Sequence, residues 1–464
     1  MKIKLTAMIF VLTLSGCQTF RTPPPEKPPL PAAWLYQDTK ITPAASKSHF
    51  FANDEDFWQS FGDPALPTLI NLALRQNAQV KLGELQARLA RIQASLAGLS
   101  RWPSTSLSLS AGVSRPFYHP GGLKSHSLRS ASAAFSAGLP LDIWGKDAAV
   151  REAADLEASA SESDTRAIRL AICSAVAEAR WQIGFLNLIK SHARADVNDA
   201  QQIVELTQTR FTAGAIGAGD SVFAQRALAE REIMLSQAEQ NLTEARLAFN
   251  LIMGNAPQQA FDELQTLPES PLPQVQAGIP ADILANRADV QAAELRLRAS
   301  LAEADAVRLS FYPSFNLTAS YGTLSPTLTQ YFRDPIGALS ATLALPFIQF
   351  NTTRFSRQSA YLVYEANKVS FINTLYSALK DVEKALSARD RLAEQAEQRR
   401  QALSLSREVV NLTFIRWQQG STDIQPWLEA KSAFRGAEIG FEQNVLERRR
   451  NVLALYRSLK GGGK

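Results

Sequence analysis

The chain has 464 residues but only two cysteines and four histidines, and this scarcity limits the kinds of site it can hold. The histidines are scattered, without the spacing that lets several of them bind one metal ion. We find no nucleophile beside a base, no phosphate-binding loop and no cluster of metal ligands. The sequence therefore predicts a protein that is not an enzyme and has no metal or cofactor.

Two further absences narrow the class of protein. Basic and acidic residues are interspersed, with a formal net charge of +5, so no basic stripe suited to nucleic acid occurs. After residue 16 no apolar run is long enough for a transmembrane helix.

The first residues read as an export signal. Lys2 and Lys4 precede a short apolar run, and Leu14-Ser15-Gly16-Cys17 resembles the bacterial lipobox, in which the cysteine carries acyl chains such as palmitate. The alternative is an ordinary signal with an incidental cysteine. We favour a signal peptide at 1–16, lipidation of Cys17 and, since Gln18 follows, the outer membrane. Residues 17–56 begin with a proline-rich stretch that would extend about 30 Å as polyproline.

The rest of the chain repeats one pattern. Val80-x3-Glu84-Leu85 recurs as Val290-x3-Glu294-Leu295, 210 residues later. Arg210-Phe211-x2-Gly214 recurs as Arg416-Trp417-x2-Gly420, 206 residues later. One loop that is four residues shorter in the second copy reconciles both offsets. We expect two structural repeats, with repeat 1 at 57–253, a connector at 254–280, repeat 2 at 281–459 and a tail at 460–464. A first helix is expected to open over 57–77, from its apolar spacing.

Each repeat contains a pair of segments that alternate strictly between apolar and Ser, Thr or Asn residues. The pair lies at about 104–140 in repeat 1 and at about 314–347 in repeat 2. One apolar and one polar face is what a transmembrane β-strand needs, and the plainer alternative is a pair of surface hairpins on a soluble sheet. Four strands cannot close a barrel, so the protein must oligomerise. After each hairpin come two long segments almost free of glycine and proline, at 146–210 and 220–253 and again at 352–415 and 423–459, which we predict to be helices.

These features together resemble the TolC-like outer-membrane factors, in their lipoprotein branch. The resemblance is carried by the lipobox, Phe57-Trp58-x2-Phe61-x-Asp63-Pro64, Leu139-Pro140-Leu141-Asp142-Ile143-Trp144-Gly145 and both Arg-aromatic-x2-Gly turns. Ala288 departs from it, since the family usually has proline there. The resemblance implies an α+β membrane protein that forms a homotrimer, with a twelve-stranded β-barrel in the outer membrane continued by a twelve-helix α-barrel in the periplasm. It also implies a periplasmic membrane-fusion adaptor and an inner-membrane RND-type pump as partners.

Residues near the two helix-to-helix turns are the candidates for a periplasmic gate. In a trimer each acid would form a ring of three carboxylates that favours cations, although an Asp just past a turn also caps a helix. Arg210 and Arg416 suit the negative end of their helices, or pair with the acids and hold the tunnel shut, with Trp417 as an apolar plug. The gate candidates are Asp220, Asp423, Glu429, Arg210, Arg416 and Trp417, and the residues expected to form the turns and contact the adaptor are Gly214, Gly217, Gly420, Ser421 and Thr422.

The predicted function is passive conduction of drugs or other toxic small molecules from the pump to the exterior. A conduit for protein secretion and a non-conducting structural or adhesive lipoprotein remain the alternatives. The sequence does not name the substrate, because a passive duct takes its specificity from the pump upstream.

Overall fold

The computed structural model describes residues 31, 33–36, 54–114, 128–275, 280, 286–325 and 335–459. The predicted signal peptide, Cys17 and the tail lie outside the described residues. The chain divides into two compact units. In the described part of the chain, unit 1 takes its residues from Gln86–Glu162 and Ala292–Asn373, and unit 2 takes its residues from Pro29–Leu85, Ser163–Gln291 and Thr374–Lys464.

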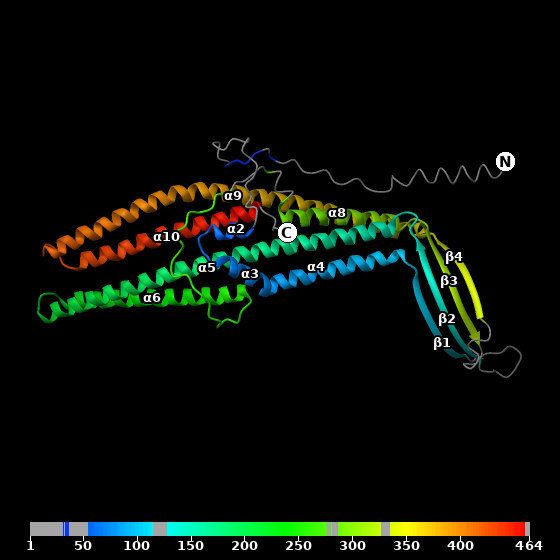
Figure 1. Ribbon diagram of the computed structural model, residues 1–464, viewed down its shortest axis with the longest axis horizontal. Helices are drawn as coiled ribbons and strands as arrows, with labels where there is room; N and C mark the ends of the chain where they lie inside the picture. The colour runs from blue at the N-terminus through cyan, green and yellow to red at the C-terminus, as the bar shows by residue number, and fades with distance from the viewer. Residues whose placement is uncertain are drawn as a thin grey trace. The chain divides into compact units, whose positions relative to one another are not determined.

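Unit 1 contains one antiparallel sheet built from the two hairpins. Its strands are β1 (Ser104–Ser114), β2 (Leu128–Leu141), β3 (Ser314–Ser325) and β4 (Pro335–Ala344). They lie side by side in chain order (Figure 1), because β2 of the first hairpin pairs with β3 of the second. The sheet therefore has β1 and β4 as its edge strands.

The alternation in the sequence separates the two faces of this sheet. Ser106 lies opposite Ser136 and Ser110 opposite Ser132, and in each pair the hydroxyl oxygens are 2.7 Å apart. The apolar face is open, with Leu109 70% and Leu339 83% exposed. An apolar face that the chain itself leaves open requires a cover from outside the chain.

The second hairpin ends earlier than we predicted. β4 stops at Ala344, and Pro346–Ile348 form the short 3₁₀ helix η4 instead of continuing the strand to 347. Pro346 has no N–H to donate to a ladder and its ring fixes φ near the helical value, which favours this exit from the strand.

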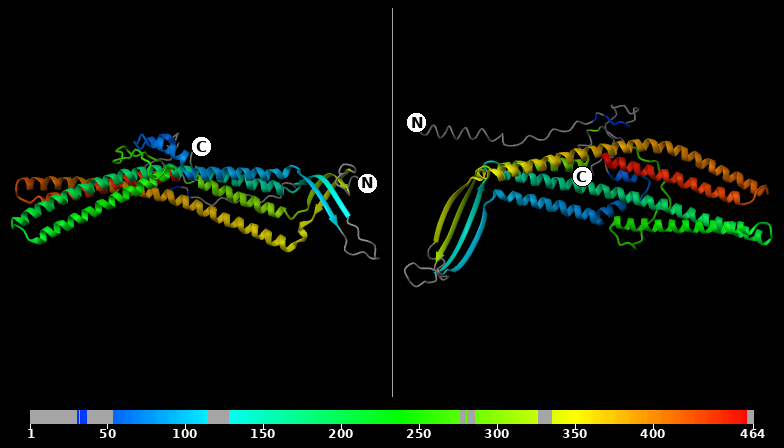
Figure 2. Two further views of the ribbon diagram at one scale, coloured as in Figure 1. Left: turned by 90° about the horizontal axis from the view of Figure 1, so that it is seen from below. Right: turned by 180° about the vertical axis from the view of Figure 1, so that it is seen from behind.

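Three of the four long helices extend slightly beyond the predicted segments, and α10 starts two residues later than predicted. α5 spans Lys146–Thr212 and α6 Ala218–Met253, and they form a hairpin that α9 (Phe350–Gln418) and α10 (Gln425–Leu459) repeat, as the views in Figure 2 show. α4 (Ala78–Ala97) and α8 (Ala288–Leu309) start 210 residues apart, whereas α5 and α9 end 206 residues apart. η2 (Gly98–Arg101) links α4 to β1. In the described part of the chain no helix has the length and apolarity needed to cross a membrane.

The single helix predicted over 57–77 is wrong. The structure has α2 (Asp54–Gln59) and α3 (Leu66–Gln76), separated by Gly62 in the left-handed conformation with φ of 73°. A Cβ at Gly62 would lie 2.4 Å from the hydroxyl of Ser270, which donates a 2.5 Å hydrogen bond to the carbonyl of Phe61. The break lets the connector approach the backbone, which a continuous helix would forbid.

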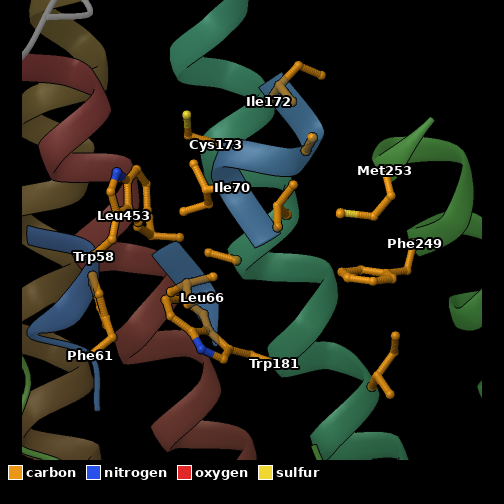
Figure 3. Packing of buried hydrophobic residues seen from close by; sticks show 14 of the residues in the cluster. Trp58, Phe61, Leu66, Ile70, Ile172, Cys173, Trp181, Phe249, Met253 and Leu453 are labelled. Atoms are coloured by element: carbon orange, nitrogen blue, oxygen red, sulfur yellow. The ribbon is translucent and has the colours of Figure 1, made fainter. Parts of the chain in front are cut away.

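The main hydrophobic core lies in unit 2, where α2 and α3 pack against α5, α6 and α10. Figure 3 shows Phe61 and Leu66 beside Trp181, with Phe249 and Met253 at the other end of the cluster. Phe57 stacks on Tyr456 of α10, with ring centroids 3.6 Å apart. Cys173, 8% exposed, is a small apolar member of this core. The aromatic motif that supports the family resemblance is therefore core packing.

Two buried arginines fasten the connector to this core. Arg180 donates to the carbonyl of Asp262 (2.6 Å), and Arg449, 1% exposed, donates to the carbonyls of Phe61 (3.1 Å) and Pro268. Burial lowers the pKa of Arg449 to about 10. A segment with little regular structure thereby becomes a fixed part of unit 2.

Candidate gate at the helix tips

Both long hairpins of unit 2 turn in the same way. Gly214 and Gly420, with φ of 74° and 70°, follow the last turns of α5 and α9. In repeat 1 the N–H of Ala215 donates to the carbonyl of Arg210 (2.8 Å), and in repeat 2 the N–H of Ser421 donates to the carbonyl of Arg416 (3.0 Å). This is the Schellman arrangement, which needs a left-handed residue and therefore favours glycine. The repeated Arg-aromatic-x2-Gly motif thus encodes a turn.

Arg210 and Asp423 join the two turns. The Arg210 guanidinium donates two hydrogen bonds to the Asp423 carboxylate, from Nη1 to Oδ2 at 2.8 Å and from Nη2 to Oδ1 at 2.6 Å. The hydrogen bond with Arg210 holds the pKa of Asp423 below its usual value and raises the pKa of Arg210. Both side chains stay open to solvent, at 37% and 57% exposed. The pair is a solvent-accessible tie between the repeats.

Asp423 does not begin a helix, which differs from our prediction. α10 starts at Gln425, two residues beyond the predicted start at 423. The carboxylate of Asp423 is directed to Arg210 of the other repeat, so for Arg210 the structure contains the pairing with an acid that was one of its two expected roles.

Asp220 instead caps the N-terminus of its own helix, α6. It lies in the first turn of α6, and its carboxylate accepts a hydrogen bond from the backbone N–H of Gly217 (3.3 Å), the residue before that helix. Capping of this kind satisfies an N–H that has no partner within the helix. The structure thus brings Arg210 and Asp423 together but leaves Asp220 in a local role.

The remaining candidates lie in the repeat 2 hairpin. Trp417 stacks on Trp427 with centroids 5.2 Å apart, and Phe414 completes this aromatic group. Glu429 accepts a hydrogen bond from Gln425 (2.8 Å). Trp417 therefore packs within its own hairpin, whereas Arg416, Ser421, Thr422 and Glu429 are exposed.

The two tips differ in chemistry at equivalent positions. Phe414 and Trp427 of repeat 2 correspond, 206 residues earlier, to Gln208 and Ser221 of repeat 1. The aromatic pair has centroids 5.1 Å apart, while the Ser221 hydroxyl and Gln208 Oε1 form a 3.1 Å hydrogen bond. One hairpin is held near its tip by ring packing and the other by a polar contact.

Sequence reasoning missed a second charged group farther along α5 and α10. It contains Asp196 and Asp199 of α5 with Lys431 and Arg435 of α10. The spacing of these residues on each helix is visible in the sequence, but more than 230 residues separate the partners. No local pattern identifies such a pairing.

Comparison with known proteins identifies the family. The family of outer membrane efflux proteins matches residues 69–255 and 279–461. The pyoverdine export outer membrane protein OpmQ of Pseudomonas aeruginosa is 27% identical over 97% of this chain and 95% of its own. The outer membrane protein OprJ of the same species is also 27% identical, over 99% and 95%.

The solved structures agree in fold. The CmeC outer membrane channel of Campylobacter jejuni has a TM-score of 0.84, is 18% identical, and is matched over 96% of this chain and 94% of its own. Two repeats of a hairpin with long helices are thus the fold of an efflux channel, as the TolC-like resemblance implied. The chain belongs to the outer membrane efflux protein family, and it is an outer-membrane channel for efflux and not an enzyme.

Proposed function

We propose that this chain forms a gated, passive duct that carries small toxic molecules from a periplasmic adaptor and an RND-type pump to the exterior. The observation that carries the proposal is the sheet, whose strands have one face of small uncharged polar residues and one exposed apolar face. Lipid on the apolar side and water on the polar side satisfy both faces. The polar face includes Ser106, Ser108, Ser110, Ser132, Ser136, Thr318, Ser320, Ser340 and Thr342.

The edges of unit 1 support closure by copies of the chain. β1 and β4 are edge strands, and an edge in lipid needs another strand to pair with. Next to them, α4 exposes Leu89, Ile92 and Leu96, η2 exposes Leu99, and α9 exposes Phe355, Leu362 and Val369, each by 56% or more. These residues follow the spacing of a coiled-coil seam. Different surfaces at the two edges suit a ring, and we take three copies from the family resemblance.

The predicted lipidation site at Cys17 adds a second attachment to the membrane in this proposal. We propose that Cys17 carries the lipid and that residues 17–56 connect it to the folded body. One acyl chain alone binds a membrane only marginally. Because the strands would already hold the protein in the membrane, the lipid adds attachment on the periplasmic side of the outer membrane.

We assign the gate to the helix tips of unit 2. The Arg210–Asp423 tie holds the two hairpins of one chain together, and three copies of the acids Asp220, Asp423 and Glu429 would place negative charge at the narrow end. Such rings favour cations. The adaptor would contact the turns around Gly214, Gly217, Gly420, Ser421 and Thr422. Substrate choice belongs to the pump; OpmQ bears the name of pyoverdine export, which fits a duct for small molecules.

Single-channel conductance of the lipid-embedded oligomer tests the proposal. We expect small, cation-selective openings in the wild type, larger ones in Arg210→Ala and Asp423→Ala, and weaker selectivity in Asp220→Ala or Glu429→Ala. Arg194→Ala is the matched control, because Arg194 forms an exposed pair with Glu239 on the neighbouring helix. Intact oligomers without conductance in every variant would exclude a duct.

A further inference from the structure

Polar pairs join α5 to α10 and to the turn that precedes α10, along one antiparallel seam. From the tip upward the pairs are Arg210–Asp423, Asp199–Lys431, Asp196–Arg435 and Gln182–Arg450. Between the last two, His192 Nε2 lies 3.3 Å from Glu438 Oε2. Each step back along α5 is matched by a similar step forward along α10. The seam therefore links repeat 1 to repeat 2 over much of unit 2.

One part of this seam is much more buried than the tip. We name it the charged clasp: Asp196, Asp199, Lys431 and Arg435. Arg435 donates from Nε to Asp196 Oδ1 (2.8 Å) and from Nη2 to Asp199 Oδ2 (2.6 Å), while Lys431 donates to Asp199 Oδ1 (2.8 Å). The side chains of Arg435 and Asp199 are each 10% exposed.

The difference in burial between the tip pair and the charged clasp decides which of the two breaks first. Water replaces the partners of an exposed pair easily, so such pairs contribute little to stability. Separating a buried pair leaves charges without partners in a poorly hydrated place, which is strongly unfavourable. Movement of the tips therefore breaks Arg210–Asp423 readily but meets its main resistance at the charged clasp.

Each incoming helix also has a threonine hydrogen bond to its own backbone near its end. The hydroxyl of Thr207 donates to the carbonyl of Ile203 (2.8 Å), and that of Thr413, the equivalent residue of α9, donates to the carbonyl of Val409 (2.8 Å). Threonine hydroxyls bonded in this way compete with the helix ladder and often bend helices. The same hydrogen bond therefore occurs at the equivalent position of both incoming helices, shortly before their ends.

We propose that the charged clasp is the fixed end of the gate, so that opening is confined to the helix ends beyond it. In α5 the moving part runs from Asp199 to Arg210, about 16 Å of helix. The inference rests on the proposed function, because it assumes that the tips open. It adds that Arg435, with no contact to the tip pair, sets how far the opening travels.

Hydrogen exchange followed by mass spectrometry on the lipid-embedded, full-length oligomer tests this boundary. In Arg210→Ala/Asp423→Ala we expect exchange at 200–212 to speed up about tenfold, with 186–198 changed by less than about twofold. Adding Arg435→Met, Asp196→Asn and Asp199→Asn removes the buried pairs of the clasp, and the remaining cation, Lys431, is 31% exposed and keeps contact with water. The faster exchange is then expected to spread into 186–198.

The matched control adds Arg194→Ala to the tip variant, because Arg194 lies at the level of the clasp but pairs with Glu239 of α6. With this control, faster exchange is expected to remain limited to the residues after Asp199. The proposal is overturned if exchange speeds up past 199 with the clasp intact, if clasp removal leaves the boundary in place, or if the tip variant exchanges like the wild type. A tip variant whose conductance does not increase contradicts the proposed gate. The conductance measurement is independent of where the hydrogen exchange changes along α5.

Discussion

The guanidinium of Arg180 donates two hydrogen bonds to the carboxylate of Asp63 in the core of unit 2, from Nε to Oδ2 at 2.5 Å and from Nη2 to Oδ1 at 3.3 Å. Their side chains are 3% and 2% exposed. The pair joins the break between α2 and α3 to the middle of α5, so a residue of the family motif holds the core together.

Replacing Asp63 is therefore expected to destabilise the protein. Asp63→Asn leaves the Arg180 charge buried with a weaker partner, which should cost about 3–5 kcal/mol of unfolding free energy. Denaturant titration in detergent measures it. Glu84→Gln is the control, since it breaks the exposed pair with Arg169 and should cost less than about 1 kcal/mol. Equal losses in the two variants would contradict the assigned role.

The tip pair predicts a charge-swap result. Arg210→Asp places two carboxylates together and should raise the single-channel conductance at least about twofold. Arg210→Asp/Asp423→Arg restores opposite charges at the same positions and is expected to return the conductance toward the wild-type value. A double variant as open as the single variant would show that the pair does not hold the tips.

His192 predicts a pH dependence of stability. Burial lowers the pKa of His192 from 6.5; Glu438 and Asp196 act to raise it, and Arg435 lowers it further. Between the folded and unfolded pKa values the unfolded chain binds more protons. The unfolding free energy should therefore fall as pH drops from above 6.5, until the pH is below the folded pKa. Denaturant midpoints measured against pH should show a shallower fall in His192→Gln and a steeper one in Glu438→Gln, which removes the stabilising charge.

The strand faces predict opposite outcomes for neighbouring substitutions. Ser108 lies on the polar face, and Leu109, 70% exposed, on the apolar one. Ser108→Asp should yield normal oligomers with stronger cation selectivity, whereas Leu109→Asp should reduce the yield of membrane-inserted oligomer. Reversal potentials and membrane fractionation measure these effects, and the reverse pattern would mean that the faces are assigned wrongly.

Two glycines on one hairpin predict opposite changes in stability. Gly420 has φ of 70°, so Gly420→Ala should cost about 1–2 kcal/mol. Gly436 lies inside α10 with open space around its Cα, so Gly436→Ala should stabilise by up to about 1 kcal/mol. Thermal melts compare the two, and destabilisation by both would point to an unrecognised contact at Gly436.

Much of the fold is visible in the sequence because its signals are local. Strict alternation at Leu107-Ser108-Leu109 encodes a two-faced strand, and long stretches without glycine or proline encode α5 and α9. The helix break at Gly62 was missed, since apolar spacing continues through it and only the approach of Ser270 requires the left-handed backbone.

The candidate site was only partly predictable for the same reason. The glycines of the turns follow from backbone conformation, which each position imposes by itself. The partner of Arg210 does not follow from backbone conformation. Asp423, Asp220 and Glu429 are equally plausible partners until the packing of the two hairpins is known.

The sequence by itself determined the two repeats, the strand faces and the tight turns, because periodicity and backbone preference act between near neighbours. Only the tertiary structure decided that Arg210 ties to Asp423, that Asp220 caps its own helix, and that Arg435 is buried between Asp196 and Asp199. Those choices depend on which helices pack together and on how much water is left at each contact, and neither is written in any local stretch of the chain.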